Sequence, residues 1–418
     1  MFELFFRSGS AKDSFEPKSI RSEDKKRDIP NVPLLLRPIV KKLQSKFNIG
    51  SLDFRLPNGY SGVLKGKYEG PNAKIILHSW APLRKLLTGG GLGFSEAFLE
   101  KEWDSPNLSK FIEIISLNSI QDDHKGNLYT RLISLLRNFL RRNTRSGSKK
   151  NISAHYDLGN EFYSRWLDPS MTYSSAFFNG KNIDLKKAQE NKYNHLLNIM
   201  KVKPGASILE IGCGWGGFAA FAGKKGFKVT GITISKEQYI YSKELIEREN
   251  LNNKVKIELR DYRDVSSVYD NIVSIEMIEA VGEKYWSDYF NTVSRYLKPG
   301  GSFGLQAITM NDKQFNNYRK QADFIQTYIF PGGMLPSRKI IQDYSLKAGM
   351  KVILDKGFGL DYALTLSKWR NNFISSWPDI QSLGFDNHFK RLWDMYLSSC
   401  EGSFRSGRID VRQIVIKN

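Results

Sequence analysis

Four glycines stand within six residues at the end of an apolar run, in "ILEIGCGWGGF". They are Gly212, Gly214, Gly216 and Gly217. Because glycine has no Cβ, its backbone adopts dihedral angles that other residues avoid and lets a ligand approach closely. A tight turn alone needs fewer glycines than this. The loop joins a strand-like run to a helix-like run, so we expect it at the carboxyl end of a strand in an α/β sheet, where such sheets bind ligands.

Two classes of ligand compete for this loop. A dinucleotide would need an acidic residue about 20 positions further on to hold a ribose hydroxyl, but the next strand-like run ends in "GITISKEQ", with no acid before Glu237. Glu210 instead lies two residues before the first glycine. This E-x-G-x-G-x-G arrangement, with "RYLKPGG" at 295–301, resembles the class I methyltransferases, which bind S-adenosylmethionine (SAM). The resemblance implies an α/β fold with a Rossmann-like seven-stranded sheet and helical insertions.

The elements that must position the loop alternate along the second half of the chain. The strand-like runs are "SILEIG", "KVTGITIS", "KVKIELRD", "YDNIVSIEM" and "GSFGLQAI", and helical runs separate them. This alternation predicts a parallel sheet with helices on both faces. Residues 48–118 show shorter runs punctuated by Gly and Pro and then helical patterns, which predicts a smaller α+β domain. We therefore expect a leader at 1–30, an N-terminal lipid- or membrane-associating domain at 31–150 and a catalytic domain at 151–418.

Positive charge is concentrated in the first third of the chain. The net charge is +20, and residues 1–150 hold 27 Lys and Arg against 15 Asp and Glu. This excess indicates an anionic partner, either nucleic acid or a membrane surface. Segments 32–47 and 127–150 combine basic residues with apolar residues at helical spacing, which suits a membrane interface. Such helices could also pack on the catalytic domain with only their charges outward. The apolar face of the first segment consists of Leu35, Leu36, Ile39, Val40, Leu43 and Phe47.

Composition and missing motifs exclude several classes of protein. Two cysteines, Cys213 and Cys400, cannot build a disulfide framework or a zinc site, so we expect no metal and a reducing compartment. No apolar run is long enough to span a bilayer, and "MFELFFRSGSAKD" does not have the form of a secretory signal. A methyltransferase for nucleic acid would show an Asn/Asp-Pro-Pro-aromatic motif after the fourth strand or a Pro-Cys loop. The sequence has "SIEMIEAVG" at the first of these places and neither cysteine in such a loop, so we expect no nucleic-acid partner.

Beyond the glycine loop, the sequence is similar to the cyclopropane-fatty-acyl-phospholipid synthases and their mycolic-acid relatives. The similar segments include "HYDLGNEFYSRWLDPSMTYSSAFF", "IGCGWGGF", "GITISKEQ", "RDYRD", "IEMIEAVG", "YIFPGGMLPS", "LDYALTLSKWRNNF" and "YLSSCEGSFRSG". They cover nearly everything after residue 151, in the order that the family shows. "LPNGYSGVLKGKYEGP" and "GFSEAFLEKEWDSPNLSKFI" also resemble the N-terminal domain of longer members.

The resemblance implies methyl transfer from SAM to a cis double bond of an unsaturated phospholipid acyl chain. The resulting carbocation then loses a proton from the new methyl group, and a cyclopropane ring closes. Together with Glu210, the residues implied to bind SAM are Tyr173, Ser174, Gly212, Gly214, Gly216, Thr233, Gln238 and Tyr262. The cation needs a dry pocket with aromatic faces and no stray nucleophile. Candidate aromatic residues are Tyr318, Phe324, Tyr328, Phe330, Tyr362, Trp369 and Phe373.

A base must accept the proton, and in the family a bound bicarbonate is thought to do so. The resemblance assigns its ligands to Glu279, Tyr362 and the backbone of Ile308. Two positions depart from the family, because Ser175 stands in place of a cysteine and Gln306 in place of a histidine. A further histidine of the family is replaced by Ala280. Ser and Gln can donate hydrogen bonds to an anion but do not titrate near pH 7, so methylation is a safer expectation than ring closure.

These departures leave several outcomes open. Glu279 would either act as the base itself or be a structural carboxylate that caps a helix, and the product would be a cyclopropane, a methyl-branched chain or a methylene chain. Cys400 matches a cysteine once proposed as the nucleophile, but the chemistry needs no covalent enzyme intermediate, so we expect it in the pocket wall. The acceptor would otherwise be a head-group amine or another small molecule, or the chain would be a non-catalytic membrane-binding protein.

We therefore expect a cytoplasmic bacterial enzyme, peripheral on the inner membrane face, that meets phospholipid at an anionic membrane surface. Chain length, double-bond position and the role of residues 1–30 do not follow from the sequence. The oligomeric state is also open, with a homodimer as one option.

Overall fold

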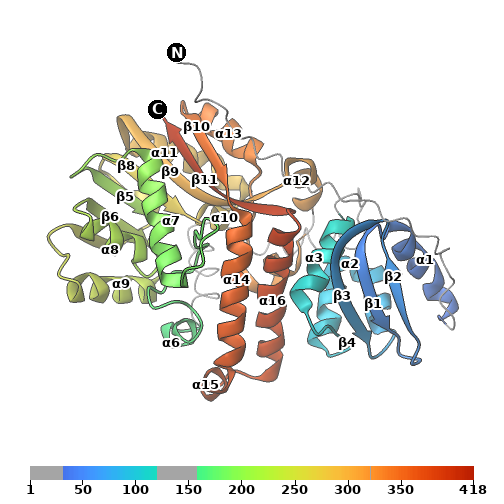
Figure 1. Ribbon diagram of the computed structural model, residues 1–418. Helices are drawn as coiled ribbons and strands as arrows, with labels where there is room; N and C mark the ends of the chain where they lie inside the picture. Colours follow the sequence, from blue (N-terminus) through green and yellow to red (C-terminus); the bar gives the residue numbers. More distant parts are fainter. Residues whose placement is uncertain (1–31, 120–157, 321) are drawn as a thin grey trace, which may run out of the picture.

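The computed structural model describes residues 32–119, 158–320 and 322–418 (Figure 1). The predicted leader and the second basic segment, 127–150, lie outside the described residues. Within the described part, the strands form a seven-stranded sheet and a separate four-stranded sheet. No helix in these ranges combines the length and apolarity needed to cross a membrane.

The seven-stranded sheet has the strand order β10-β11-β9-β8-β5-β6-β7. Its strands are β5 (Ser207–Ile211), β6 (Lys228–Thr233), β7 (Val255–Leu259), β8 (Tyr269–Ile275), β9 (Leu297–Met310), β10 (Lys351–Gly357) and β11 (Ile409–Lys417). Strands β5 to β9 pair in parallel, and β11 pairs antiparallel to both β9 and β10. The predicted α/β class is confirmed, but the sheet is mixed rather than wholly parallel.

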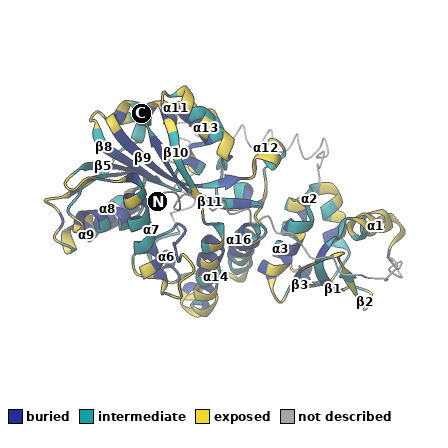
Figure 2. Cartoon of the chain, turned by 45° about the horizontal axis from the view of Figure 1, so that its top comes forward, coloured by how far each residue is buried: buried dark blue, intermediate teal, exposed yellow. Residues whose placement is uncertain are grey.

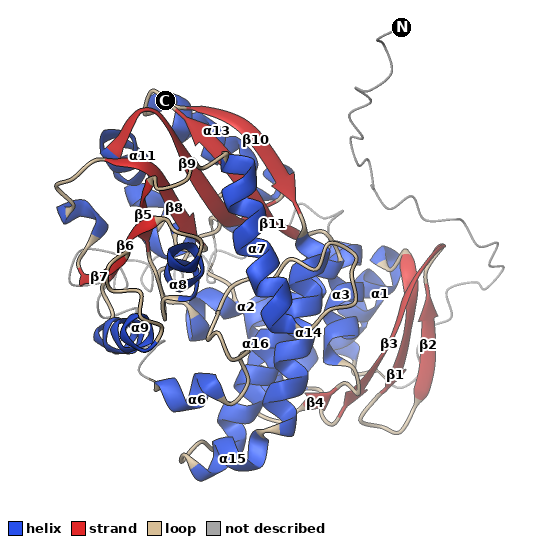
Figure 3. Ribbon diagram, turned by 60° about the vertical axis from the view of Figure 1, so that its left-hand side comes forward, coloured by secondary structure: helices blue, strands red, loops and turns tan. Residues whose placement is uncertain are grey.

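Helices cover both faces of this sheet. Those that contact the sheet or one another on one side are α7 (Leu185–Met200), α8 (Gly217–Lys224) and α9 (Lys236–Arg248), and those on the other are α11 (Trp286–Tyr296) and α13 (Arg338–Lys347). Figure 3 shows α7 and α8 in front of the sheet and α11 and α13 behind it. Because both faces are covered, the central strands are almost continuously buried, as Figure 2 shows.

The predicted boundary between α11 and β9 was wrong. The strand was expected to begin with "GSFGLQAI" at Gly301, but α11 ends at Tyr296 and β9 already begins at Leu297. Gly300 adopts a φ of +74°, and an added Cβ at Gly301 would lie 2.6 Å from the carbonyl oxygen of Asp270. The glycines therefore let the strand start beside β8 instead of forming a separate turn.

The four-stranded sheet has the order β2-β1-β3-β4 and belongs to the N-terminal part. Its strands are β1 (Ile49–Arg55), β2 (Ser61–Lys65), β3 (Tyr68–Leu77) and β4 (Trp103–Asp104), and the accompanying helices are α1 (Arg37–Lys46), α2 (Ala81–Leu99) and α3 (Leu108–Ser119). The expected α+β composition is thus present. Helix α2 bends at Gly90, where φ is +59° and ψ is −145°.

Long helices connect the two sheets. Helix α14 (Gly359–Ser375) packs beside α16 (Asn387–Arg405), and α16 in turn packs against α3 of the N-terminal part (Figure 1). Ser109 donates a hydrogen bond of 2.6 Å to Glu401 across this buried contact. Gly402 permits the close approach, because an added Cβ would lie 2.7 Å from the backbone nitrogen of Glu113. The remaining described helices include α6 (Asn160–Ser164), α10 (Ile278–Val281), α12 (Asp312–Tyr318), α15 (Trp377–Ser382) and a π-helical segment (Ile325–Ile329).

Candidate active site

The glycine loop lies at the carboxyl end of β5, as predicted. Gly212, Gly214 and Gly216 have φ values of +80°, +53° and +87°, a region in which residues with a Cβ are strained. The backbone nitrogens of Gly212 and Cys213 both donate to the carbonyl oxygen of Ile232, which fixes the loop against β6. A Cβ at Gly214 would meet no atom within 4 Å. The sequence thus shapes a fixed turn whose backbone borders open space.

That open space is part of one cavity of about 1700 Å³. It exceeds the roughly 300–1000 Å³ of a typical small-ligand pocket, so it has room for two ligands. The cavity brings together all of the predicted site residues except three. Those that line it are Tyr173, Ser174, Glu210, Gly212, Gly214, Thr233, Gln238, Tyr262, Glu279, Ile308, Tyr362 and Cys400. The exceptions are Ser175, Gln306 and Gly216.

The end of the cavity beside the glycine loop carries groups that fit SAM. Ser235 caps α9, and behind it Thr233 Oγ1 donates to Gln238 Oε1 at 3.0 Å. Burial raises the pKa of Tyr262 to about 12, so its hydroxyl stays neutral. Glu210 Oε2 is buried and has no hydrogen-bond partner among the described residues. An unpaired buried carboxylate oxygen is costly, and the ammonium group of SAM is a donor that would satisfy it.

Glu276, which sequence reasoning did not single out, lies at the centre of the adjoining wall. It follows β8 directly and lines the cavity. Its Oε1 accepts hydrogen bonds from the backbone nitrogen of Ser175 at 2.9 Å and from Gln306 Nε2 at 2.7 Å. Its Oε2 accepts from the Tyr362 hydroxyl at 2.6 Å. The one available signal was the additional acid in "SIEMIEAVG", three residues before Glu279.

A buried lysine complements this carboxylate. Lys192 of α7 is 0% exposed, and its Nζ lies 2.5 Å from Ser174 Oγ. Burial lowers the pKa of Lys192 to about 7, against the opposing effect of Glu276, Asp168 and Glu210. The pKa of Glu276 is raised, because burial outweighs the lowering by Lys192 and by the three hydrogen-bond donors. Glu276 is nevertheless the carboxyl group with more hydrogen-bond donors to its ionised form, three against the one donor to Glu279.

Glu279 is held separately, on the first turn of α10. Its Oε1 accepts a hydrogen bond of 2.6 Å from the backbone nitrogen of Ile308 in β9, and its Oε2 has no partner among the described residues. Burial and then the charge of Glu276 raise the pKa of Glu279 to about 8. At neutral pH it therefore holds its proton. Of the two alternatives for Glu279, the helix cap does not hold, because its side chain accepts from Ile308 of β9 and makes no cap of α10.

The residues present do not fit a bound bicarbonate ion. The donors that would have held it were Ser175, Gln306, Tyr362 and the backbone of Ile308. The first three already donate to Glu276, and the Ile308 nitrogen donates to Glu279. An added anion would have to displace Glu276 from its three donors, or take the Ile308 nitrogen from Glu279 and face the ionised Glu276, which like-charge repulsion opposes.

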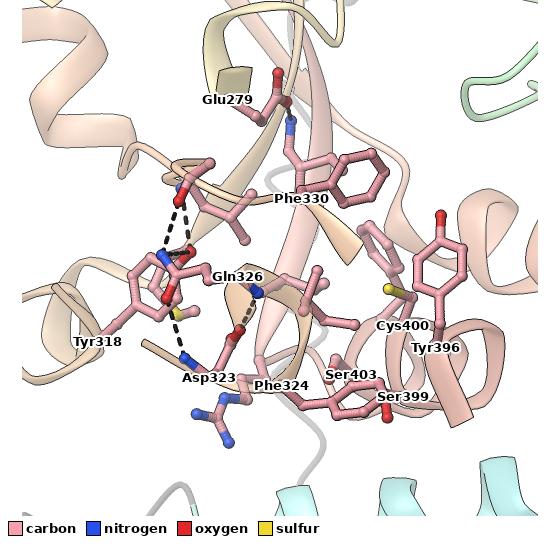
Figure 4. Close-up of a pocket in the computed structure, with 18 of the residues that line it drawn as sticks. Glu279, Tyr318, Asp323, Phe324, Gln326, Phe330, Tyr396, Ser399, Cys400 and Ser403 are labelled. Atoms are coloured by element: carbon pink, nitrogen blue, oxygen red, sulfur yellow. Dashed lines mark hydrogen bonds between the residues drawn. The ribbon is translucent and has the colours of Figure 1, made fainter. Parts of the chain in front are cut away.

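The opposite wall is aromatic and contains Cys400. Figure 4 shows Tyr396 and Cys400 together on one helix and Glu279 at the top of the view. The ring of Phe330 lies edge-on to that of Tyr396, with 5.9 Å between their centroids. Burial raises the pKa of Cys400, so its thiol is not a ready nucleophile. Of the predicted aromatic residues, Tyr318, Phe324, Phe330 and Tyr362 line the cavity. Tyr328 is 40% exposed and donates to Glu96, while Trp369 and Phe373 are 0% exposed core residues outside the lining, so those three predictions were wrong.

The far end of the cavity is apolar and is built by the N-terminal part. One face of the four-stranded sheet contributes Leu52, Phe54, Leu56, Leu64, Ile75 and Leu77, and α1 contributes Ile39, Val40 and Leu43. The alternative that the first basic segment packs with only its charges outward is incomplete, because Leu43 of α1 and Leu35 of the 3-10 turn before it are exposed. A single space therefore runs from the glycine loop, past Glu276 and Glu279, to an aliphatic chamber.

Comparisons with known proteins agree with this geometry. The family model "Mycolic acid cyclopropane synthetase" matches residues 143–414. The tuberculostearic acid methyltransferase UfaA1 of Mycobacterium tuberculosis is 35% identical over 363 residues, which cover 84% of this chain and 85% of the relative. The cyclopropane-fatty-acyl-phospholipid synthase of Escherichia coli is 36% identical over 337 residues, with coverage of 79% and 84%.

Solved structures show the same fold. The mycolic acid cyclopropane synthase CmaA1, complexed with S-adenosylhomocysteine (SAH) and CTAB, matches with a TM-score of 0.61 at 29% identity. The match covers 65% of this chain and 98% of that one. Coclaurine N-methyltransferase, bound to N-methylheliamine and SAH, matches with a TM-score of 0.59 at 17% identity, over 78% of this chain and 98% of that one, and supports the fold alone.

Proposed function

This chain belongs to the mycolic acid cyclopropane synthetase family and is a SAM-dependent lipid methyltransferase; we propose that it converts cis double bonds of unsaturated phospholipid acyl chains to cyclopropane rings. The observation that carries the proposal is the continuous cavity between the glycine loop and the aliphatic chamber. A polar end suits a nucleoside with an amino-acid group, and an aliphatic end suits an acyl chain. The double bond would then lie between them, beside the two carboxyl groups.

The residues of the wall suit a reaction through a carbocation. When bound, SAM supplies the methyl group that is transferred to the double bond. Phe330, Tyr362 and Tyr396 offer aromatic faces that stabilise positive charge and exclude water. The thiol of Cys400 stays protonated, so it does not capture the cation. The pocket therefore protects a reactive acyl chain until a proton is removed.

The mouth of the aliphatic chamber suits an anionic membrane. Leu43, Leu87 and Ile115 line the cavity and are 42%, 52% and 37% exposed. Lys42 and Lys46 of α1 line the same rim. Exposed aliphatic residues beside lysines bind the interface of a bilayer, with roughly 1 kcal/mol for each basic residue near an anionic surface. We therefore propose that residues 31–150 dock the enzyme peripherally on an anionic membrane surface, through which the acyl chain reaches the cavity.

A second product is favoured by one comparison. The relative from M. tuberculosis carries the name tuberculostearic acid methyltransferase. The same cation would give a methylene chain by a hydride shift and loss of a proton, and a separate reductant would be needed to convert that chain to a saturated methyl branch. Both products begin with the same methylation, so the cavity does not distinguish between them.

The experiment is lipid mass spectrometry after incubation of the purified full chain with SAM and vesicles of a cis-monounsaturated phospholipid. We expect the acyl chain to gain the mass of one CH₂ and to resist catalytic hydrogenation. A product of the same mass that takes up hydrogen would replace the cyclopropane with a methylene chain. Methylation of the head group alone would contradict the acyl substrate, and the absence of any methylated lipid would contradict the proposed function.

A further inference from the structure

Three hydrogen-bond donors from three separate segments converge on the carboxylate of Glu276. They are the backbone nitrogen of Ser175, Gln306 Nε2 of β9 and the Tyr362 hydroxyl of α14. Hydrogen bonds to an ionised carboxylate favour its charged form. A carboxylate that faces a cavity from such a cradle is held in one position, so it meets the geometric requirement for a group that acts on a bound substrate.

The orientation of Gln306 is fixed by a second layer of hydrogen bonds. Gln413 Nε2 of β11 donates to Gln306 Oε1 at 2.9 Å, so the amide of Gln306 must turn its NH₂ group toward Glu276. Gln413 Oε1 lies 2.6 Å from His195 Nδ1. All of these side chains come from elements of the rigid sheet and its covering helix. The cradle is therefore preorganised rather than a chance contact.

The backbone of Glu276 is strained. Its φ is +52°, in the left-handed region that glycine adopts without penalty and that other residues adopt at a cost. Its backbone nitrogen donates to the carbonyl oxygen of Gln306 at 2.8 Å, which holds the residue in this conformation. Strain of this kind persists where the side chain is needed in one place, and it clusters at functional sites.

We propose that Glu276 is the base of the active site and that its carboxylate takes the place of an external anion. The inference rests on the proposed function. A C–H bond of the newly transferred methyl group breaks, and its electron pair forms the C–C bond to the cationic carbon that closes the ring. The proton passes to Glu276 Oε2, which accepts one hydrogen bond from the described residues whereas Oε1 accepts two. If a hydride first shifts from the methyl-bearing carbon to the cationic carbon, the electron pair of the methyl C–H bond forms a C=C bond instead, and the same proton transfer gives the methylene chain.

The neighbouring groups support this assignment. The ammonium form of the buried Lys192, whose pKa is about 7, favours the ionised form of Glu276. Glu279 holds its proton at neutral pH and therefore cannot accept another at the start of the step. The Tyr362 hydroxyl donates a hydrogen bond to Glu276 and keeps the carboxylate directed along the cavity wall. We accordingly assign Tyr362 and Gln306 as positioning residues.

The test compares the full-length wild type with Glu276→Gly and Glu276→Gln in CO₂-free buffer, with SAM and unsaturated phospholipid vesicles. We expect the wild type to be fully active without bicarbonate, and both variants to lose at least about 100-fold in rate, the usual range for a lost general base. Bicarbonate or formate should restore activity to Glu276→Gly, where space for an anion has been opened, but not to Glu276→Gln.

Structural damage is separated from loss of the base by two measurements. SAH binding, followed by calorimetry, should be unchanged in Glu276→Gly. The thermal unfolding midpoint of Glu276→Gly should not be lowered by backbone strain, because glycine adopts the left-handed conformation without a penalty. Lys201→Gly, at another left-handed position with φ of +54° outside the cavity, is the matched control for that relief.

Three outcomes would overturn the inference while leaving the proposed function intact. They are a wild type that requires added bicarbonate, a Glu276→Gly variant that is fully active without an added anion, and a folded, SAH-binding Glu276→Gly variant that neither anion rescues. A wild type that methylates no lipid under any of these conditions would instead contradict the proposed function.

Discussion

At the scale of single residues, a substitution at Gly214 tests the prediction of the SAM-binding loop most directly. A valine there would be strained at φ of +53° and would extend into the open space beside the loop. We expect Gly214→Val to abolish SAH binding by calorimetry. The matched control is Gly349→Val, because Gly349 also has a positive φ, of +77°, and no atom within 4 Å of an added Cβ, but lies outside the cavity. Equal SAH affinity in the two variants would contradict the assignment of the loop.

Glu279 predicts a particular dependence of stability on pH. Its pKa is raised to about 8 in the folded protein, against an ordinary value of 4.5. Between these two values the unfolded chain has lost a proton that the folded protein retains, so stability falls as the pH rises. Below pH 4.5 Glu279 is protonated in both the folded and the unfolded state, so it causes no loss of stability. Above pH 8 the loss of stability that it causes has reached its full size.

Glu279→Gln cannot ionise and should therefore escape this loss. We expect its free energy of unfolding, measured in urea, to match the wild type near pH 4.5 and to exceed it progressively up to pH 8. Glu276 and Lys192 also titrate with shifted pKa values, but both are present in both proteins. Parallel pH curves for the two proteins would mean that Glu279 is not held protonated.

Which residues meet at the site could be predicted only in part. The glycines, Glu210 and Tyr362 could be predicted from motifs. The spacing within a motif indicates where a strand ends and which residues lie beside the ligand. Glu276 was missed because it and Glu279 are three residues apart, and spacing alone does not say which carboxylate faces which donors. The left-handed backbone of Glu276, which directs its side chain toward Ser175 and Gln306, is a property of the folded strand end rather than of the sequence.

At the scale of elements, the contact between α3 and α16 joins the N-terminal part to the rest of the described chain. An added Cβ at Gly402 would lie 2.7 Å from the backbone nitrogen of Glu113 and 2.8 Å from the carbonyl oxygen of Ser109. We expect Gly402→Ala to destabilise the protein by about 1–3 kcal/mol, as overpacking usually does. The measurement is the urea midpoint of unfolding.

Gly91→Ala is the matched control for this effect. Gly91 also lies in a helix, but nothing stands within 4 Å of the added Cβ. Alanine is favoured over glycine in helices by up to about 1 kcal/mol, so this variant should be neutral or slightly more stable. If Gly402→Ala behaved in the same way, the helices would not be packed as closely as described.

The elements themselves were predicted well where the chain alternates locally. Strands β5, β6, β7 and β8 and their helices follow from apolar periodicity, because strand and helix alternate over short distances along the chain. The antiparallel strands β10 and β11 could not be read from this alternation, since α14, α15 and α16 separate them along the chain. Pairing over that distance depends on tertiary contacts, which periodicity does not report.

At the scale of the whole molecule, the cavity is a product of two sheets that the sequence placed in separate domains. The glycine loop belongs to the seven-stranded sheet, and the aliphatic chamber belongs largely to the four-stranded sheet. Its continuity depends on how α3 meets α16, which no local pattern specifies. The excess of positive charge in the first third of the chain, in contrast, could be predicted from composition. In the structure, part of this charge lies on α1, whose Lys42 and Lys46 line the cavity.

This placement predicts how the protein binds membranes. Lys41 and Lys42 are exposed on α1, close to the exposed leucine Leu43. Since each basic residue near an anionic leaflet contributes roughly 1 kcal/mol, the double variant Lys41→Gln/Lys42→Gln should bind anionic vesicles about 30-fold more weakly at low salt. Added salt should weaken wild-type binding and narrow the difference, because it screens these charges. The measurement is vesicle co-sedimentation at several salt concentrations.

The control must remove the same charge from another part of the surface. Lys243→Gln/Lys256→Gln does so, because both side chains are exposed, on α9 and β7, and α9 lies at the opposite end of the molecule from α1 (Figure 1). If net charge alone attracts the vesicles, both double variants should weaken binding equally. If the mouth of the chamber is the docking surface, the α1 variant should lose far more. Binding that ignores salt and lipid charge would contradict docking through this basic surface altogether.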